Sequence, residues 1–108
     1  MQRLFAVAAL VVALAIPSMA MAATLSKGQG ATCNGTSTWL FVNKKTIGAP
    51  AGELTAYFSG GITATTGPSA VFTNKQEFYV ETIGTGSITL INAVTNLPGN
   101  LVLQRVTC

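Results

Sequence analysis

The sequence contains no histidine and no aspartate, and its only acidic side chains are Glu53, Glu77 and Glu81. Without histidine or aspartate, no Ser-His-Asp or Cys-His arrangement can activate a nucleophile near neutral pH. The same absence removes histidine-based zinc sites and calcium loops of the EF-hand type. We therefore expect no catalytic residue, no metal site and no cofactor, and we expect that the protein is not an enzyme.

Glu77 and Glu81 are the best remaining candidates for a paired-carboxylate site. On one strand they share a face, but four residues at about 3.3 Å each separate their backbones by roughly 13 Å. The two carboxylates of glycosidases lie about 5–9.5 Å apart, so these side chains would have to bend toward each other. A solvated strand face is the simpler interpretation of this pair.

Charge is also scarce, because only 8% of the residues are charged. Beyond Arg3 the cations are scattered singly or in one pair, as Lys27, Lys44, Lys45, Lys75 and Arg105. Proteins that bind nucleic acid present a basic stripe that neutralises many phosphates. These five cations form no such stripe, so we expect no nucleic-acid partner.

The first 22 residues have the organisation of a secretory signal peptide, here of bacterial composition. Arg3 provides the positive start, Leu4–Ile16 the short apolar core, and Ala20–Ala22 the small-residue cleavage site. The apolar run is shorter than the roughly 20 residues of a membrane-spanning helix. We therefore expect export to the periplasm or the medium, and no stable membrane insertion after cleavage.

Cys33 and Cys108 are the only two cysteines in the chain. In an oxidising compartment they have one possible intramolecular pairing, and a small domain gains much of its stability from such a bridge. An intermolecular bridge or a free thiol is the alternative. The segment 23–36 around Cys33 is small and polar, and we interpret it as a flexible N-terminal arm preceding a domain at 37–108.

Turn signals rich in Gly and Pro recur at short intervals between segments rich in Thr, Val, Ile and aromatic residues, which is typical of an antiparallel all-β domain. We expect a small antiparallel β-sandwich of about seven strands with one disulfide, or alternatively a small β-barrel. The expected strands are Thr38–Asn43, Glu53–Ser59, Ile62–Thr65, Ala70–Thr73, Gln76–Ile83, Ser87–Val94 and Asn100–Thr107. The last two are predicted to form a hairpin across residues 96–99.

Two kinds of residue are candidates for contacts with a partner. Trp39, Leu40 and Val42 belong to a strand that is apolar on both faces, so its outer face requires a cover. That cover is either the protein's own loops and N-terminal arm or another molecule. Tyr57 and Tyr79 fall on the polar faces of their strands and form either a stacking surface for a sugar or peptide or a cross-strand pair.

Two functions fit these observations. The first is an exported structural or self-associating surface protein, a matrix or filament-type subunit, because strands with few charges protect their edges poorly. The second is a small secreted or periplasmic binding module, such as an inhibitor or a carbohydrate- or peptide-binding domain. The expected partner is a second copy or another protein in the first case and a carbohydrate or peptide in the second.

Overall fold

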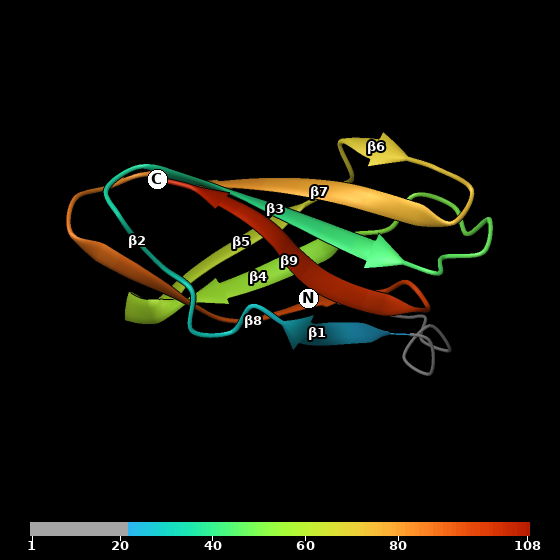
Figure 1. Ribbon diagram of the computed structural model, residues 1–108, viewed down its shortest axis with the longest axis horizontal. Helices are drawn as coiled ribbons and strands as arrows, with labels where there is room; N and C mark the ends of the chain where they lie inside the picture. The colour runs from blue at the N-terminus through green and yellow to red at the C-terminus, as the bar shows by residue number, and fades with distance from the viewer. Residues whose placement is uncertain (1–21) are drawn as a thin grey trace, which may run out of the picture.

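The computed structural model describes residues 22–108, which form nine β-strands and no α-helix (Figure 1). The predicted signal peptide lies outside the described residues except for Ala22. The strands are β1 Ala23–Lys27, β2 Thr32–Asn34, β3 Ser37–Lys44, β4 Leu54–Phe58, β5 Ile62–Thr66, β6 Ala70–Val71, β7 Lys75–Thr82, β8 Ser87–Thr95 and β9 Asn100–Thr107. A single 3-10 turn, Ser59–Gly61, connects β4 to β5. The predicted all-β class is confirmed, and each predicted strand corresponds to one of β3–β9.

The strands form one curled sheet in the order β5-β4-β8-β1-β9-β3-β7-β6, and β2 pairs with β8. We call β9, β3, β7 and β6 the front sheet, and β5, β4, β8 and β2 the back sheet, as they lie in Figure 1. Strand β1 joins them, because its start pairs with β8 and its end pairs with β9. The fold is therefore a half-barrel that combines features of the two predicted architectures.

The N-terminal segment is a structural part of this sheet and not a flexible arm. In β1 the side chains of Ala23 and Leu25 are buried, while Thr24 and Ser26 are exposed. Strand β2 pairs with β8 over three residues and buries Cys33. The prediction of a flexible arm at 23–36 is wrong, because alternate small apolar residues suffice to seat a short strand between two sheets.

The predicted hairpin between β8 and β9 is also absent, because β1 lies between these two strands. Residues 96–99 instead carry the chain from the back sheet to the front sheet. Gly99 makes this crossing possible: its φ is +99°, and a Cβ atom there would collide with the carbonyl oxygen of Lys44.

The core lies between the inward faces of the two sheets. The Trp39 ring on β3 packs against the Phe58 ring on β4, with centroids 5.0 Å apart, and its indole N–H donates to Thr82 Oγ1 at 2.9 Å. The buried apolar residues come from both sheets and from β1: Ala23, Leu25, Cys33, Trp39, Phe41, Leu54, Ala56, Phe58, Phe78, Val80, Ile88, Leu90, Ala93, Leu97 and Leu101.

A disulfide and a buried polar cluster also join the two sheets. The predicted Cys33–Cys108 disulfide is confirmed and connects β2 in the back sheet to the residue that follows β9 in the front sheet. At the other end of the sandwich, Thr95 Oγ1 on β8 donates to Asn43 Oδ1 on β3 at 2.5 Å. Asn43 Nδ2 in turn donates to the carbonyl oxygen of Pro98 at 2.8 Å. The sheets are thus connected by covalent and polar links as well as by the core.

Candidate interaction surfaces

Trp39, Leu40 and Val42 do not form an accessible surface in the folded chain. Trp39 is fully buried in the core, and Leu40 and Val42 on the outer face of β3 are only 5% and 1% exposed. Of the two covers considered for this outer face, the protein provides one itself. The cover consists of side chains from the neighbouring strands and not of the loops or N-terminal arm that the sequence suggested.

The cover over Leu40 comes from β7 and β9, the two strands that flank β3. In register, Leu40 pairs with Tyr79 on one side and with Arg105 on the other. The Arg105 guanidinium donates to Tyr79 Oη at 3.3 Å, which connects these two side chains from strands on opposite sides of β3. Long side chains shield apolar neighbours in this way while their polar ends stay in water.

Tyr57 and Tyr79 do not form a common stacking surface. Tyr57 is on β4 of the back sheet and is 41% exposed, whereas Tyr79 is on β7 of the front sheet and is 44% exposed. Because both side chains point outward from opposite sheets, the sandwich separates them. Neither a shared sugar-binding platform nor a cross-strand tyrosine pair is formed.

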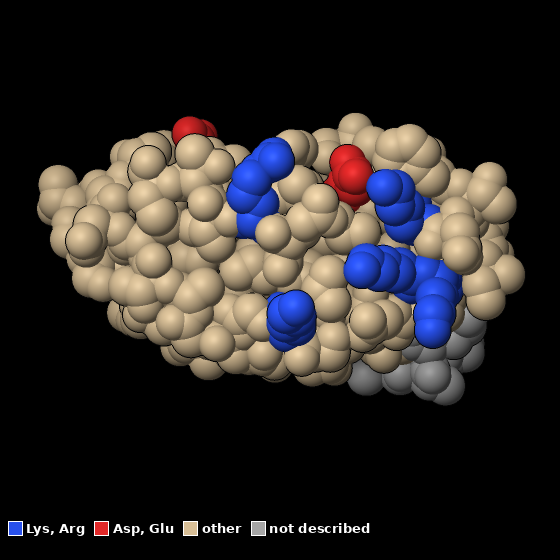
Figure 2. Space-filling model, viewed as in Figure 1, with Lys and Arg blue, Asp and Glu red and all other residues tan. Residues whose placement is uncertain are grey.

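Charged residues are distributed unequally between the two sheets. Figure 2 shows lysine and arginine side chains gathered on the face of the front sheet. The strand pairing explains this, because Lys27, Lys44, Lys75 and Arg105 all occupy outward positions around β9 and β3. In contrast, the back-sheet strands β2, β4, β5 and β8 contain no charged residue.

The outward face of the back sheet is rich in threonine. Several hydroxyl groups satisfy one another across strands: Thr32 Oγ1 and Thr89 Oγ1 are 3.1 Å apart, and Thr55 Oγ1 and Thr65 Oγ1 are 3.2 Å apart. Apolar groups interrupt this face at Tyr57 and at Ile91, which is 55% exposed. The face is polar enough to remain hydrated but has no charge to repel a similar surface.

Strand β5 is the open edge of the back sheet. It pairs with β4 along one side over all five residues, from Leu54–Thr66 to Phe58–Ile62, and ends the strand order on the other. Its sequence, Ile-Thr-Ala-Thr-Thr, contains neither a charge nor a proline. Natural edge strands are usually protected by lysine, proline, a bulge or very short length. At the opposite edge, β6 has such protection, because it is only two residues long.

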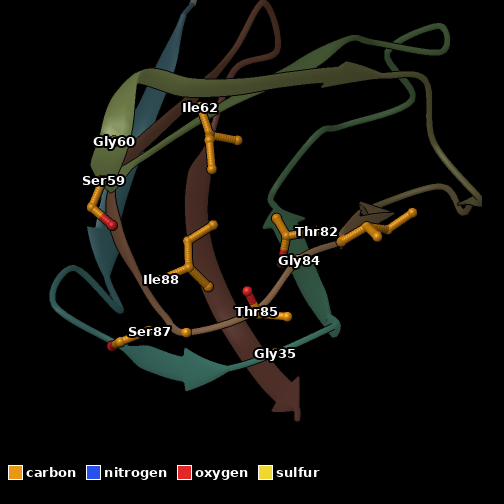
Figure 3. Close-up of a pocket in the computed structure, with 11 residues that line it drawn as sticks. Gly35, Ser59, Gly60, Ile62, Thr82, Gly84, Thr85, Ser87 and Ile88 are labelled. Carbon is orange, nitrogen blue, oxygen red and sulfur yellow. The ribbon is translucent and has the colours of Figure 1, made fainter.

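A small neutral pocket opens next to the start of β5 (Figure 3). Its volume is about 270 Å³, and its apolar lining comes from Ile62 on β5, Ile83 after β7 and Ile88 on β8. In Figure 3 the side chains of Ile62 and Ile88 lie on one side of the opening, with Thr82 and Thr85 on the other. No lining residue is titratable, so the pocket favours an uncharged group.

The opposite end of the molecule is basic. Lys44, Lys45 and Lys75 surround Phe72 in an open depression of about 570 Å³, and Lys75 Nζ lies 5.0 Å from the centre of the Phe72 ring. The adjacent loop exposes Ile47, whose side chain is 80% accessible to solvent. Lys75 also forms the ion pair of this region, with Glu77 at 3.6 Å.

Reactive chemistry is lacking in the described part of the chain. Residues 22–108 contain no group of three or more potential metal ligands and no free thiol. Within the same residues there is no helix of sufficient length and hydrophobicity to cross a membrane. No family model, curated protein or solved structure matches the chain.

The two features that the sequence interpretation missed are the open edge at β5 and the exposed Ile47. The first had a visible signal, because no charged residue occurs between Glu53 and Lys75. The second had none, because a lone isoleucine before a glycine is equally compatible with a buried position.

Proposed function

We propose that this chain is an exported structural protein without catalytic activity that associates with copies of itself through the edge strand β5. One observation carries the proposal: β5 has an unpaired edge without charge or proline, in a sheet whose strands β2, β4, β5 and β8 bear no charged side chain. The predicted signal peptide supports export. The Cys33–Cys108 disulfide is consistent with the oxidising conditions of the periplasm or the extracellular space.

The expected contact is an antiparallel pair of β5 strands related by a two-fold axis through Ala64. Symmetric interfaces of this kind are the commonest among homo-oligomers, and strand addition satisfies the free backbone groups of both edges. In this register Thr63 of one copy faces Thr65 of its partner on the outer surface. The back sheets of two molecules would then form one continuous sheet.

The proposal is tested with a double variant, Thr63→Lys/Thr65→Lys, which places like charges opposite one another across the two-fold axis. Both threonines are exposed, so we expect the monomer to stay folded. The molar mass in solution, measured by light scattering over a range of concentrations, should fall from that of an oligomer to that of a monomer. Thr24→Lys is the matched control, because Thr24 is exposed on β1, which is paired on both sides.

A second mixture makes the test specific for the edge. The Thr63→Glu/Thr65→Glu variant should also be monomeric alone, but mixing it with the lysine variant should restore association through opposite charges. Failure of the mixture to associate, with wild type still oligomeric, would place the contact elsewhere.

A wild-type protein that remains monomeric at all concentrations would favour a small binding module instead. The observation that supports this alternative is Tyr57, an exposed aromatic ring on the threonine-rich back face. A carbohydrate or peptide would be its ligand, and Tyr57→Ala would weaken binding.

A further inference from the structure

We propose that Ile47 of one molecule inserts into the pocket formed by Ile62, Ile83 and Ile88 of the next, so that copies also join end to end. This inference rests on the proposed self-association but uses a different surface from β5. Figure 1 shows the loop after β3, which carries Ile47, and the turn between β7 and β8, which borders the pocket, at opposite ends of the sandwich.

Ile47 has an unusual backbone conformation that holds its side chain in solvent. Its φ is +51°, in the left-handed region, which is a genuine outlier for a β-branched residue. Glycine or asparagine would occupy this position with less strain. An apolar, strained and exposed residue therefore opposes the stability of the monomer, and such outliers are concentrated at sites of binding or switching.

The loop is fixed firmly enough to present this side chain in one direction. The backbone N–H of Lys45 donates to the carbonyl oxygen of Asn74 at 2.8 Å, and that of Gly48 donates to Thr73 at 2.6 Å. Thr46, directly before Ile47, is buried. A rigid apolar projection loses little conformational entropy when it binds.

The pocket has matching properties at the other end. Ligand pockets for drug-sized molecules usually have volumes of about 300–1,000 Å³. At about 270 Å³ this pocket is smaller than that range, yet it has ample room for the four carbons of an isoleucine side chain. Its neutral, isoleucine-rich lining suits an apolar group, and Ile83 at its border is itself 80% exposed.

The charges around the two surfaces are complementary. Ile47 lies within two or three residues of Lys44 and Lys45 on the basic end. Glu81 is exposed on β7, two residues before Ile83, and forms no ion pair with any described residue. Insertion of Ile47 would bring these lysines toward Glu81 of the next copy, which favours this orientation of the two molecules.

A contact between two different ends of the same molecule is heterologous. Such a contact adds molecules in one direction and produces a ring or an open filament, unlike the closed pair formed by a two-fold axis. End-to-end contacts would therefore extend the assembly, whereas β5 contacts would join molecules laterally.

The first test is the substitution Ile47→Gly, which removes both the apolar side chain and the backbone strain. We expect assemblies larger than a dimer to disappear, while the monomer unfolds at a higher denaturant concentration than wild type. Ile47→Asn, which tolerates the same backbone conformation, should behave in the same way. Unchanged assembly in both variants, or loss of assembly together with a less stable monomer, would overturn the inference.

The second test detects the contact directly with a thiol-reactive bifunctional cross-linker, which leaves the native disulfide intact. A mixture of Ile47→Cys and Ile83→Cys variants should form a cross-linked heterodimer that neither variant forms alone to the same extent. Ile91→Cys replaces Ile83→Cys in the control, because Ile91 is exposed on the back face far from the pocket lining.

These results separate the two proposals. Oligomers that depend on Thr63 and Thr65, without the heterodimer, would overturn the end-to-end contact and leave the β5 contact standing. The heterodimer in a protein whose mass does not respond to the β5 variants would support the end-to-end contact and overturn the β5 contact. A monomeric protein without the heterodimer would overturn both.

Discussion

The front and back faces of this sandwich meet water in different ways. On the front, apolar residues such as Leu40 lie outside the core but are covered by long side chains, including the hydrogen-bonded pair Tyr79 and Arg105. On the back, short threonine side chains cover the sheet and bond to one another, and no charge is present. The front face therefore protects itself by charge and bulk, while the back face is hydrated but undefended against a second sheet.

This difference shows that apolar strands are a poor guide to the interface in a small β protein. The most apolar strand, β3, is central in the front sheet and inaccessible, whereas the polar strand β5 is the open one. Backbone pairing at an edge needs no apolar side chains, because the free N–H and C=O groups supply the contacts. The location of charge is the more informative signal.

Breaking the covalent link between the faces should have the largest effect. Replacing both cysteines, as Cys33→Ala/Cys108→Ala, opens a loop that spans 75 positions, and loop entropy predicts a loss of about 4 kcal/mol in the free energy of unfolding. Urea unfolding of the variant and of wild type, with and without reductant, measures this. Reductant should destabilise only wild type; equal stability of the two proteins without reductant would show that the disulfide adds nothing.

The buried polar link between the sheets should contribute less. Asn43→Ala removes the acceptor of the Thr95 hydroxyl and the donor to the Pro98 carbonyl. Because both groups would remain without partners near the core, we expect a loss of about 2 kcal/mol, measured by urea unfolding. Asn92→Ala, on the outward side of β8, serves as the control and should change stability much less. Similar losses in both variants would argue against a special role for the buried link.

The smallest effect tests the two faces directly through their exposed tyrosines. Tyr79→Ala uncovers Leu40 and removes the Arg105 contact, so we expect a loss of about 1 kcal/mol. Tyr57→Ala uncovers no buried apolar side chain on the back face, and its effect should stay within about 0.5 kcal/mol. Thermal and urea unfolding of the two variants provide the comparison, and the reverse order would show that the front-face cover is unimportant.

The sequence was informative where side-chain alternation was regular. Phe78 and Val80 alternate with Tyr79 and Glu81, and strand β7 appears where this pattern placed it. The disulfide could be anticipated because two cysteines allow one intramolecular pair. In these cases a local pattern determines the result.

Long-range pairing could not be read from local patterns. Nothing in residues 23–27 specifies that β1 inserts between β8 and β9, and without that knowledge the turn at 96–99 resembles a hairpin. The cover over Leu40 likewise depends on the register that brings Tyr79 and Arg105 to either side of it. Strand order and register are properties of the whole sheet, so the faces of the sandwich emerged only in the structure.

The position of β1 also has a consequence for the rate of folding. Leu25 pairs with Leu101, so contacts that complete the front sheet join residues from nearly opposite ends of the described chain. Domains with many such distant pairings have a high contact order and fold slowly, in milliseconds to seconds. A chain that crosses a membrane unfolded benefits from this delay, because the sheet cannot close until its last strand has emerged beside its first.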